Sequence, residues 1–345
     1  MEIKKQKTAF VTGSAGFIGF HVCTRLLAEG WRVVGLDSMS DYYDITLKVR
    51  RESMLLQSAF YRSVHEKVET PNVLMNLFEE EQPEVVIHLA AQAGVRYSIE
   101  NPRAYLESNI NGTFELLEAA RAYPPKHMLF ASTSSVYGSN EEMPYKETVR
   151  ADHQISFYAA TKKSTENMAH SYAHLFGLPI TMFRFFTVYG PWGRPDMAPH
   201  KFTRAILNGD QIDVYNNGDM KRDFTYVGDL VEAIYRLLTI VPTRTDEAVM
   251  SKTDSLSRVA PWRVVNIGNS DPVQLLDFID TIQSVIGHKA KMNLMDMQAG
   301  DVPATWADIS LLKSLTGYEP KTRLEDGVRL FVDWFEAYYS SSHIQ

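Results

Sequence analysis

The sequence contains little of what marks a secreted protein. Its 345 residues include a single cysteine, Cys23, so no disulfide can form within the chain. Cys23 lies in an apolar segment with helical spacing, where a packed structural thiol is more common than a nucleophile. Residues 1–7 carry charges but lack the apolar stretch of a signal peptide. We therefore expect a protein of the reducing cytoplasm.

Long apolar runs and an excess of basic charge are also lacking. No run of about eighteen apolar residues occurs, so we expect no membrane-spanning helix. The formal charge is −7, and the longest basic stretch is Lys4-Lys5-Gln6-Lys7. This balance argues against a surface for nucleic acid or for an anionic membrane. With 45% hydrophobic residues, the chain can form one large core or two unequal ones.

Near its start the sequence predicts a site for a dinucleotide. An apolar strand, Thr8–Thr12, leads into Gly13-Ser-Ala-Gly16-Phe-Ile-Gly19, a helix over Ile18–Glu29, and a strand, Arg32–Leu36, that ends at Asp37. In such a unit, amides at the helix N-terminus receive a pyrophosphate, and the carboxylate accepts from a ribose hydroxyl. Asp37 favours NAD, because it would repel a 2′-phosphate. The spacing differs from Gly-x-Gly-x-x-Gly, so a glycine-rich turn of another α/β protein is the alternative.

Strands and helices continue to alternate over the next hundred residues. The pattern predicts helices over Asn72–Glu81 and Pro102–Tyr123, and strands over Val85–Leu89 and His127–Ser132. This alternation is typical of an α/β protein with a Rossmann-type, doubly wound parallel sheet that has helices on both faces.

Two segments of small and polar residues directly follow expected strands. Ala90–Gly94 comes after one strand and Thr133-Ser-Ser135 after the next. Because ligands bind at the carboxyl ends of parallel strands, we expect both segments to border the cofactor. A tight connection and a helix cap are the alternatives.

A helix expected over Ser156–Phe176 contains a candidate acid–base pair. Tyr158 and Lys162 are four residues apart, so they share one helix face and can reach one substrate hydroxyl. The pKa of tyrosine is ordinarily near 10, and a nearby lysine with an oxidised nicotinamide ring would lower this pKa by about three units. Tyr158 could then accept a proton at neutral pH. Such pairs are also common on solvated helix surfaces.

The same helix carries two further features. His170 and His174 have the spacing of metal ligands, but no carboxylate cluster accompanies them, and we expect no metal site. A second face of the helix is apolar and comprises Met168, Ala169, Tyr172, Leu175 and Phe176. Either a partner subunit or the protein's own core could cover this face.

After residue 179 the pattern becomes less regular. A strand is expected over Ile180–Phe185, followed by a constrained Pro/Gly loop, Val188–Asp196. Further elements are expected as strands near Ile212–Tyr215 and Arg263–Ile267 and helices near Asp229–Leu238, Gln274–Ile286 and Leu324–Tyr339. The polar residues 243–261 are expected to form a mobile excursion. We predict a cofactor domain over residues 1–179, with added sheet strands from about 180–228 and 260–270, and a smaller, interleaved C-terminal α/β substrate domain over 180–345.

Together the motifs resemble a known superfamily. Gly13-x-x-Gly16-x-x-Gly19, Asp37, Thr133 and Tyr158-x-x-x-Lys162 are similar to those of the extended short-chain dehydrogenase/reductases, in particular NAD-dependent nucleotide-sugar epimerases. Longer strings resemble UDP-glucuronate 4-epimerases, namely Leu89–Ser98, Thr187–Ala198, Arg222–Tyr226 and Gly300–Val302. The resemblance implies bound NAD and reversible C4 epimerisation of UDP-glucuronate to UDP-galacturonate through a 4-keto intermediate. It also implies a homodimer formed through the Tyr158 helix and the helix after Asn109.

The resemblance implies roles for individual residues. Tyr158 is the base, Lys162 holds the nicotinamide ribose and lowers the pKa of the tyrosine, and Thr133 shares the proton of the 4-hydroxyl. The other cofactor contacts are Gly13, Gly16, Phe17, Ile18, Gly19, Asp37, Leu89, Ala90, Ala91, Gln92, Asn109, Ser132, Phe185 and Val188. The contacts with the nucleotide sugar are Arg96, Ser134, Ser135, Thr187, Arg194, Lys201, Val214, Tyr215, Arg222 and Asp301. Arg222 and Asp301 would hold the uridine diphosphate, for which a guanidinium is well suited.

One position departs from the family pattern. Where relatives have an Asp that contacts adenine after the third strand, this chain has Lys67. The usual acceptor for the adenine would then be missing, and Glu66 or Glu69 would have to replace it.

The residues after Thr133 separate the related reactions. Sugar dehydratases and decarboxylating UDP-xylose synthases carry acidic side chains there, whereas this chain has Ser134 and Ser135. We therefore expect the reaction to stop at oxidation and reduction of C4. An epimerase of UDP-glucose or of a UDP-N-acetylhexosamine is the nearer alternative, and Thr187 and Arg194 argue for a uronate. A non-catalytic NAD-binding protein is a further alternative.

Overall fold

The protein is built around a parallel sheet. The computed structural model describes residues 6–244, 253–298 and 300–342. In this part of the chain, seven strands pair in the order β10-β6-β5-β4-β1-β2-β3, and every pair is parallel. The strands are β1 Thr8–Thr12, β2 Arg32–Asp37, β3 Tyr61–His65, β4 Val85–His88, β5 His127–Thr133, β6 Ile180–Phe185 and β10 Trp262–Ile267. The chain runs outward from β1 to β3 and then returns to β4 on the other side of β1. The predicted doubly wound sheet is confirmed, and its switch point lies between β1 and β4.

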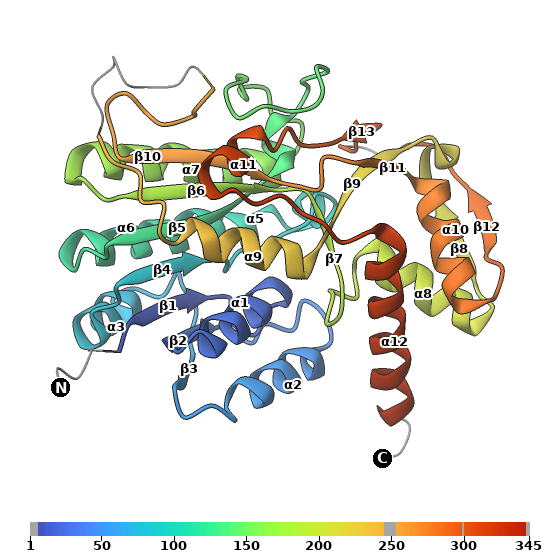
Figure 1. Ribbon diagram of the computed structural model, residues 1–345, viewed down its shortest axis with the longest axis horizontal. Coiled ribbons are helices and arrows are strands. Elements are labelled where there is room, and N and C mark those ends of the chain that lie inside the picture. The colour runs from blue at the N-terminus through green and yellow to red at the C-terminus, as the bar shows by residue number, and fades with distance from the viewer. Residues whose placement is uncertain (1–5, 245–252, 299, 343–345) are drawn as a thin grey trace.

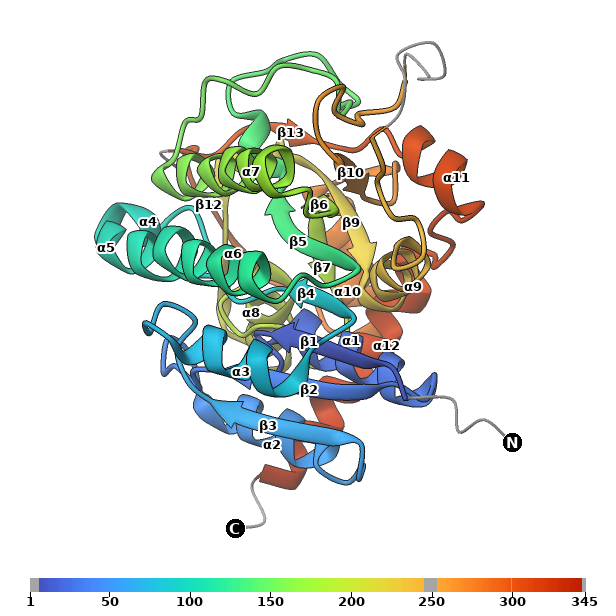
Figure 2. The same ribbon diagram turned by 90° about the vertical axis from the view of Figure 1, so that its left-hand side faces the viewer.

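Successive residues of the strands point into two different cores, because side chains alternate across a sheet. Ala9 and Val11 pack toward α1 (Phe17–Ala28), α9 (Val227–Leu237) and α11 (Ser310–Thr316). Phe10 packs toward α3 (Val73–Glu81), α6 (Gly112–Ala122) and α7 (Phe157–Phe176). Figure 2 shows these two helix layers on opposite faces of the sheet. Cys23 is fully buried in the first core, as expected of a packed thiol.

Most predicted elements occur with bounds shifted by a few residues. The helix expected over Pro102–Tyr123 is built from α5 (Pro102–Tyr105), a π-helical turn η1 (Leu106–Asn111) and α6. Four α-helices of the described residues that the sequence pattern did not reveal are α2 (Ile45–Leu55), α4 (Tyr97–Glu100), α8 (Ala198–Asn208) and α11. Of the predicted excursion, residues 245–252 lie outside the described residues. Its later part is tied to the sheet, because Arg263 of β10 donates two hydrogen bonds to Asp254, at 2.9 and 3.0 Å.

A smaller α/β part is built around β9 (Lys221–Tyr226). This strand pairs with β7 (Thr187–Tyr189), β11 (Pro272–Gln274) and β13 (Ala304–Thr305), while β8 (Gln211–Val214) pairs with β12 (Lys291–Leu294). Its core also receives α8, α10 (Leu275–Ile286) and α12 (Leu324–Ser342), and the stacked rings of Phe224 and Phe278 are 4.0 Å apart. In Figure 1 this part lies at one end of the sheet, on the right.

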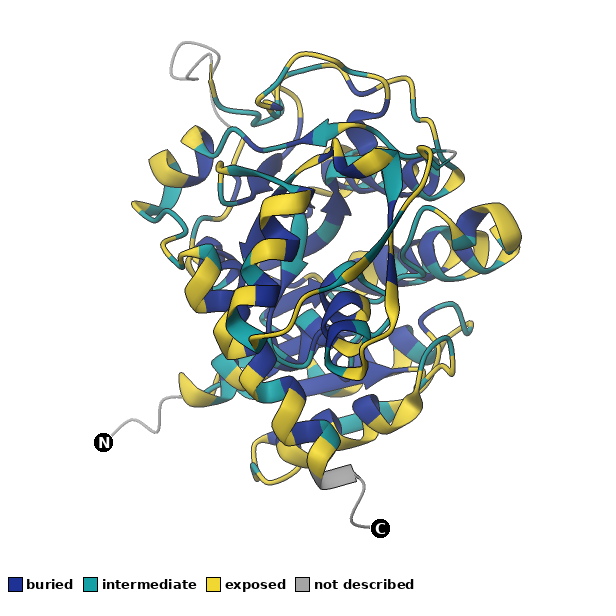
Figure 3. Ribbon diagram, turned by 90° about the vertical axis from the view of Figure 1, so that its right-hand side faces the viewer, coloured by how far each residue is buried: buried dark blue, intermediate teal, exposed yellow. Residues whose placement is uncertain are grey.

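The connections place this smaller part at the carboxyl ends of the sheet strands. β6 ends at Phe185 and β7 begins at Thr187, while β10 ends at Ile267 and β11 begins at Pro272. Figure 3 shows buried strands of the sheet beneath partly exposed connecting segments. The edge of the sheet that carries the predicted site therefore faces the smaller part. Within the described ranges, no helix combines the length and the apolar character needed to cross a membrane.

Candidate active site

The turn between β1 and α1 requires glycine for steric reasons. Gly13 has a φ of 71°, and a Cβ there would lie 2.8 Å from the backbone nitrogen of Ala90. A Cβ on Gly19 would lie 2.0 Å from the carbonyl oxygen of Gly13. The spacing Gly-x-x-Gly-x-x-Gly therefore brings the start of α1 against the loop that follows β4.

The start of α1 and the end of β2 fit the predicted cofactor. Among the described residues, no side chain caps α1, and its first turn contains no acidic residue. Its amides can therefore receive the pyrophosphate of a dinucleotide. Asp37 stands beside them, where its carboxylate accepts from the amides of Ala15 (3.1 Å) and Met39 (2.9 Å). Lys48 also donates to Asp37, at 3.1 Å, a partner that the sequence pattern did not indicate.

Residues of the loop after β4 are connected to α7 through Asn109. The side chain of Asn109 accepts from the amide of Gln92 at 2.8 Å and donates to its carbonyl oxygen at 3.1 Å. It also donates to Thr161 Oγ1 on α7, at 3.0 Å. Nearer β4, the amides of Leu89 and Ala90 both donate to Thr12 Oγ1, at 3.1 Å. The loop is thus fixed against β1, η1 and α7.

Thr133, Tyr158 and Lys162 come together at the end of β5. Thr133 caps the short helix η2 (Ser134–Tyr137), since its Oγ1 accepts from the amide of Ser135 at 3.2 Å. Tyr158 lies in the first turn of α7, partly buried, with its ring 5.9 Å from that of Tyr105. Lys162 follows one turn later and is buried. The structure therefore joins two segments that are 25 residues apart between Thr133 and Tyr158.

Burial has the largest effect on the pKa values of Tyr158 and Lys162. Burial raises the pKa of Tyr158, and hydrogen bonding to Thr133 and the charge of Arg194 lower it less, so the net pKa lies above 10. Burial lowers the pKa of Lys162 to about 8, against the charge of Glu166, which raises it. The protein's own groups thus raise the pKa of Tyr158, whereas the expected fall depends on lysine together with a bound, oxidised nicotinamide. A positive nicotinamide ring is the group that would favour the phenolate.

The predicted contacts of the sugar come from three segments, namely the start of η2, β7 and the loop that follows β7. Arg194 donates from Nε to Asp196 Oδ1 at 3.0 Å, and its second nitrogen also reaches that carboxylate. The Arg194 guanidinium lies 5.9 Å from the centre of the Tyr42 ring, and its charge lowers the pKa of Tyr158. Thr187 begins β7, and Ser134 and Ser135 form the start of η2, all partly buried.

The remaining predicted contacts lie farther out. Arg222 donates to Asp301 at 2.8 Å, and the Arg96 guanidinium lies 4.7 Å from the centre of the Tyr215 ring. The side chain of Lys201 is exposed on α8. Val214, Phe185 and Val188, in contrast, pack within hydrophobic cores, so their side chains face packing neighbours.

Lys67 lies two residues after β3. Its side chain is 67% exposed, and its Nζ is 3.9 Å from Glu69 Oε1. The distance is at the limit for an ion pair, so the Lys67 ammonium lies largely in solvent. The role of Glu66 or Glu69 toward adenine stays a prediction.

The histidines of α7 contact the segment before β10. His170 Nε2 lies 2.8 Å from Ser257 Oγ, and His174 Nδ1 lies 2.8 Å from the Val259 carbonyl oxygen. Across the described ranges, no group of three or more His, Cys, Asp or Glu side chains is arranged to hold a metal ion. The apolar face of α7 is divided, since Ala169 is buried whereas Leu175 is 65% exposed.

Two buried charges beneath the site were not identified from the sequence. Glu166 of α7 and Arg184 of β6 form an ion pair with an N–O distance of 2.8 Å. The available signal was a single cation in the apolar strand Ile180–Phe185 and a carboxylate one helical turn after Lys162. Arg51 is also fully buried, and donates to the carbonyl oxygens of Ala15 and Trp192.

Comparison with known proteins finds similarity over nearly the whole chain. A probable UDP-glucuronate 4-epimerase of Rhizobium meliloti is 53% identical over 334 residues, covering 96% of this chain and 98% of that protein. UDP-glucuronate 4-epimerase 1 of Arabidopsis thaliana is 44% identical, covering 96% and 77%. A crystal structure of UDP-glucuronic acid 4-epimerase from Bacillus cereus with UDP-glucuronic acid and NAD superimposes with a TM-score of 0.85 at 32% identity, covering 96% and 100%. A family model described as GDP-mannose 4,6 dehydratase matches residues 10–331, and the chain therefore belongs to this NAD-dependent epimerase/dehydratase family.

Proposed function

We propose that the chain is an NAD-dependent isomerase that interconverts UDP-glucuronate and UDP-galacturonate at C4. The observation that carries the proposal is the meeting of Thr133, Tyr158 and buried Lys162 at the end of β5. The similarity to proteins named UDP-glucuronate 4-epimerases supports the substrate.

Bound NAD would supply the redox chemistry, by taking a hydride from C4 and returning it to the other face of the resulting ketone. The cofactor is regenerated in each cycle, so no net oxidation of the sugar occurs. Tyr158 takes the proton of the 4-hydroxyl as the C–H bond breaks and returns it when the ketone is reduced. Thr133 keeps the hydroxyl in line with the phenol, and Lys162 holds the ribose and favours the phenolate.

The 4-keto intermediate of a uronate must be protected from decarboxylation. Oxidation of C4 places a ketone β to the C6 carboxylate, and such acids lose carbon dioxide when the C5–C6 bond aligns with the carbonyl π system. The carboxylate can be held out of that alignment by hydrogen bonds from Arg194, Thr187 and the hydroxyls of Ser134 and Ser135. The charge of Arg194 lowers the pKa of Tyr158, which supports this role. The same cation would select a uronate over a neutral sugar.

The nucleotide would be held by the smaller part of the molecule. Arg222 is partly buried, and its guanidinium can exchange Asp301 for a diphosphate or share both. Arg96 and Tyr215 offer a flat cation and a ring for the uridine. We therefore infer the division into a cofactor domain over residues 1–179 and a mainly nucleotide-sugar domain over 180–345, with β6 and β10 belonging to the sheet of the first.

We further infer a homodimer in the cytoplasm. Large apolar side chains are exposed along η1, α6 and the start of α7: Leu106 (45%), Phe114 (46%), Phe157 (38%) and, in the preceding loop, Ile155 (43%). A second copy packing the same helices against these would cover them by two-fold symmetry. A sedimentation experiment with Phe114→Glu tests this, with a shift from dimer to monomer as the expected result.

Two alternatives are kept for the reaction. An epimerase of UDP-glucose is favoured by the fold of the Thermotoga maritima UDP-glucose 4-epimerase, which superimposes with a TM-score of 0.83 at 29% identity and covers 96% and 99% of the two chains. A decarboxylase or a dehydratase is less favoured, because Ser134 and Ser135 stand where further proton transfers would need acids.

The test is incubation of the purified protein with UDP-glucuronate, UDP-glucose and UDP-N-acetylglucosamine, with chromatography of the epimers. We expect UDP-galacturonate from the first and far slower turnover of the other two. The protein should need no stoichiometric NAD. Equal turnover of UDP-glucose, or consumption of one NAD per sugar, would contradict the proposal.

A further inference from the structure

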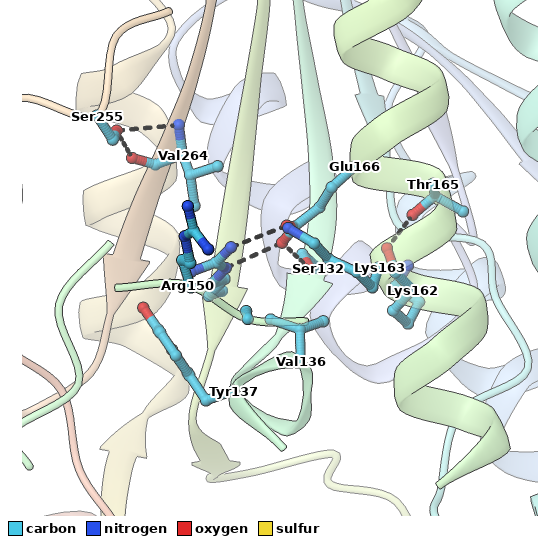
Figure 4. Close-up of polar contacts among 12 residues, drawn as sticks. Ser132, Val136, Tyr137, Arg150, Lys162, Lys163, Thr165, Glu166, Ser255 and Val264 are labelled. Atoms are coloured by element: carbon cyan, nitrogen blue, oxygen red, sulfur yellow. Dashed lines mark hydrogen bonds and ion pairs between the residues drawn. The ribbon is translucent and has the colours of Figure 1, made fainter. Parts of the chain in front are cut away.

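Glu166 is a buried carboxylate next to the candidate acid–base pair. It lies on α7, one helical turn after Lys162, and its side chain is fully buried. Oε1 accepts from Ser132 Oγ at 2.7 Å and from Arg184 Nε at 2.9 Å. Oε2 accepts from Arg184 Nη2 at 2.8 Å and from Lys163 Nζ at 3.1 Å. Figure 4 shows Glu166 pointing from α7 toward Ser132, with Lys163 beside it.

These contacts connect the segments that carry the predicted catalytic groups. Ser132 immediately precedes Thr133 at the end of β5. Arg184 comes from β6, and its guanidinium lies 4.6 Å from the centre of the Tyr137 ring in η2. Glu166 therefore binds the helix of Tyr158 and Lys162 to the strand and the short helix that position Thr133. All four hydrogen bonds involve a charged group, so they are strong and directional.

We propose that Glu166 is a positioning residue, whose carboxylate fixes α7 against β5 and so holds Thr133, Tyr158 and Lys162 in one geometry. The inference rests on the proposed function for the roles of those three residues. Glu166 has no direct contact with substrate in this proposal. Its influence passes through Ser132 to Thr133 and along α7 to Lys162.

The charge of Glu166 also acts on Lys162. Burial lowers the pKa of Lys162, and Glu166 raises it, with a result of about 8. From β4, His88 faces Lys162, and it stays neutral because burial lowers its pKa to about 3. Arg184 and Lys163 face Glu166 itself and lower its pKa, against burial. Without the Glu166 charge, the pKa of Lys162 would fall further, and fewer molecules would carry the ammonium at pH 8.

The decisive variant is Glu166→Gln, which keeps the size of the side chain and an acceptor for Ser132. We expect the alkaline limb of the kcat profile to move down by about one pH unit, with a roughly fivefold loss of kcat at pH 8. KM for the nucleotide sugar should stay within about twofold, because Glu166 does not touch it.

The control is Asp254→Asn, which removes a carboxylate from another bidentate pair, with Arg263 on β10, whose side chains are 18% and 8% exposed. A purely structural role for such pairs predicts lower stability in both variants and an unshifted profile in both. Our proposal predicts lower stability in both but a shifted alkaline limb in Glu166→Gln alone. Coincident profiles of Glu166→Gln and the wild type, or equal shifts in both variants, would overturn it.

Two further measurements keep the test conclusive. If Glu166→Gln does not fold, Glu166→Gln combined with Arg184→Met removes both buried charges and should restore folding, while the alkaline limb stays shifted.

The second measurement is the pH dependence of unfolding, which does not require an active enzyme. Because the pKa of Lys162 is about 8 in the folded protein and ordinarily 10.5, the unfolded chain binds more protons between these values, and stability rises with pH there. In Glu166→Gln this rise should begin at lower pH; an unchanged onset contradicts the link to Lys162 even if the proposed reaction fails.

Discussion

The two sides of the site handle charge differently. Beneath the acid–base pair, Glu166 and Arg184 are almost completely buried, with side chains 0% and 3% exposed. On the sugar side, Arg194 and Asp196 are 21% and 27% exposed, and Arg222 and Asp301 are 17% and 31% exposed. A buried pair cannot exchange partners without a large desolvation penalty, whereas a partly exposed cation can turn to an arriving anion. The first side is therefore suited to holding a geometry and the second to binding an anionic substrate.

The largest effect is expected on the acid–base side, from Tyr158→Phe. Loss of one hydroxyl removes the proton acceptor and leaves ring packing against Tyr105 in place. We expect kcat to fall by about three orders of magnitude or more, with folding and nucleotide-sugar affinity retained. Turnover measured by chromatography and binding measured by calorimetry separate the two. A variant that keeps a tenth of the wild-type rate would show that Tyr158 is not the base.

Arg184→Met tests how strongly the buried side depends on its ion pair. It leaves Glu166 buried with Lys163 and Ser132 as its remaining partners. We expect a loss of about 3–5 kcal/mol in the free energy of unfolding, measured with denaturant. The control is Arg236→Met, since Arg236 is 44% exposed in its pair with Glu232 and should lose less than about 1 kcal/mol. Equal losses in the two variants would remove the distinction between buried and exposed pairs.

Arg194→Ala tests the sugar side. Loss of charged hydrogen bonds to the carboxylate should weaken UDP-glucuronate binding by about 1.5–3 kcal/mol. Because the carboxylate is then less restrained, we also expect some of the 4-keto intermediate to lose carbon dioxide. That reaction leaves a 4-keto-pentose nucleotide and reduced nicotinamide, which mass spectrometry and absorbance detect. Unchanged affinity and no decarboxylated product would mean that Arg194 serves only the structure of its Pro/Gly loop.

The smallest effect is expected from Asp196→Asn, which sharpens the same comparison. Asp196 is a partly exposed partner of Arg194, so its neutralisation should cost less than about 1 kcal/mol of stability. The guanidinium would lose an internal competitor, and KM for UDP-glucuronate should fall by about twofold. Thermal unfolding and initial rates measure both quantities. A large loss of stability would place this pair with the buried one.

The family and the doubly wound parallel sheet could be predicted because they depend on local patterns. Alternating apolar residues define strands, Gly13 and Gly19 are required where backbones approach closely, and a separation of four residues places Tyr158 and Lys162 on one helix face. The small and polar segments after β4 and β5 were expected at one edge of the sheet, and these two strands are parallel neighbours whose carboxyl ends meet there.

Other features arise only when distant segments pack together. The sequence showed a lone cation in an apolar strand, but tertiary packing decided that Arg184 meets Glu166, 18 residues earlier, and that Arg96 lies over Tyr215. It also decided how deeply Tyr158 is buried, and this burial raises the pKa of the phenol. Spacing along a chain fixes which side chains share a face, whereas desolvation and long-range pairing depend on everything that packs around them.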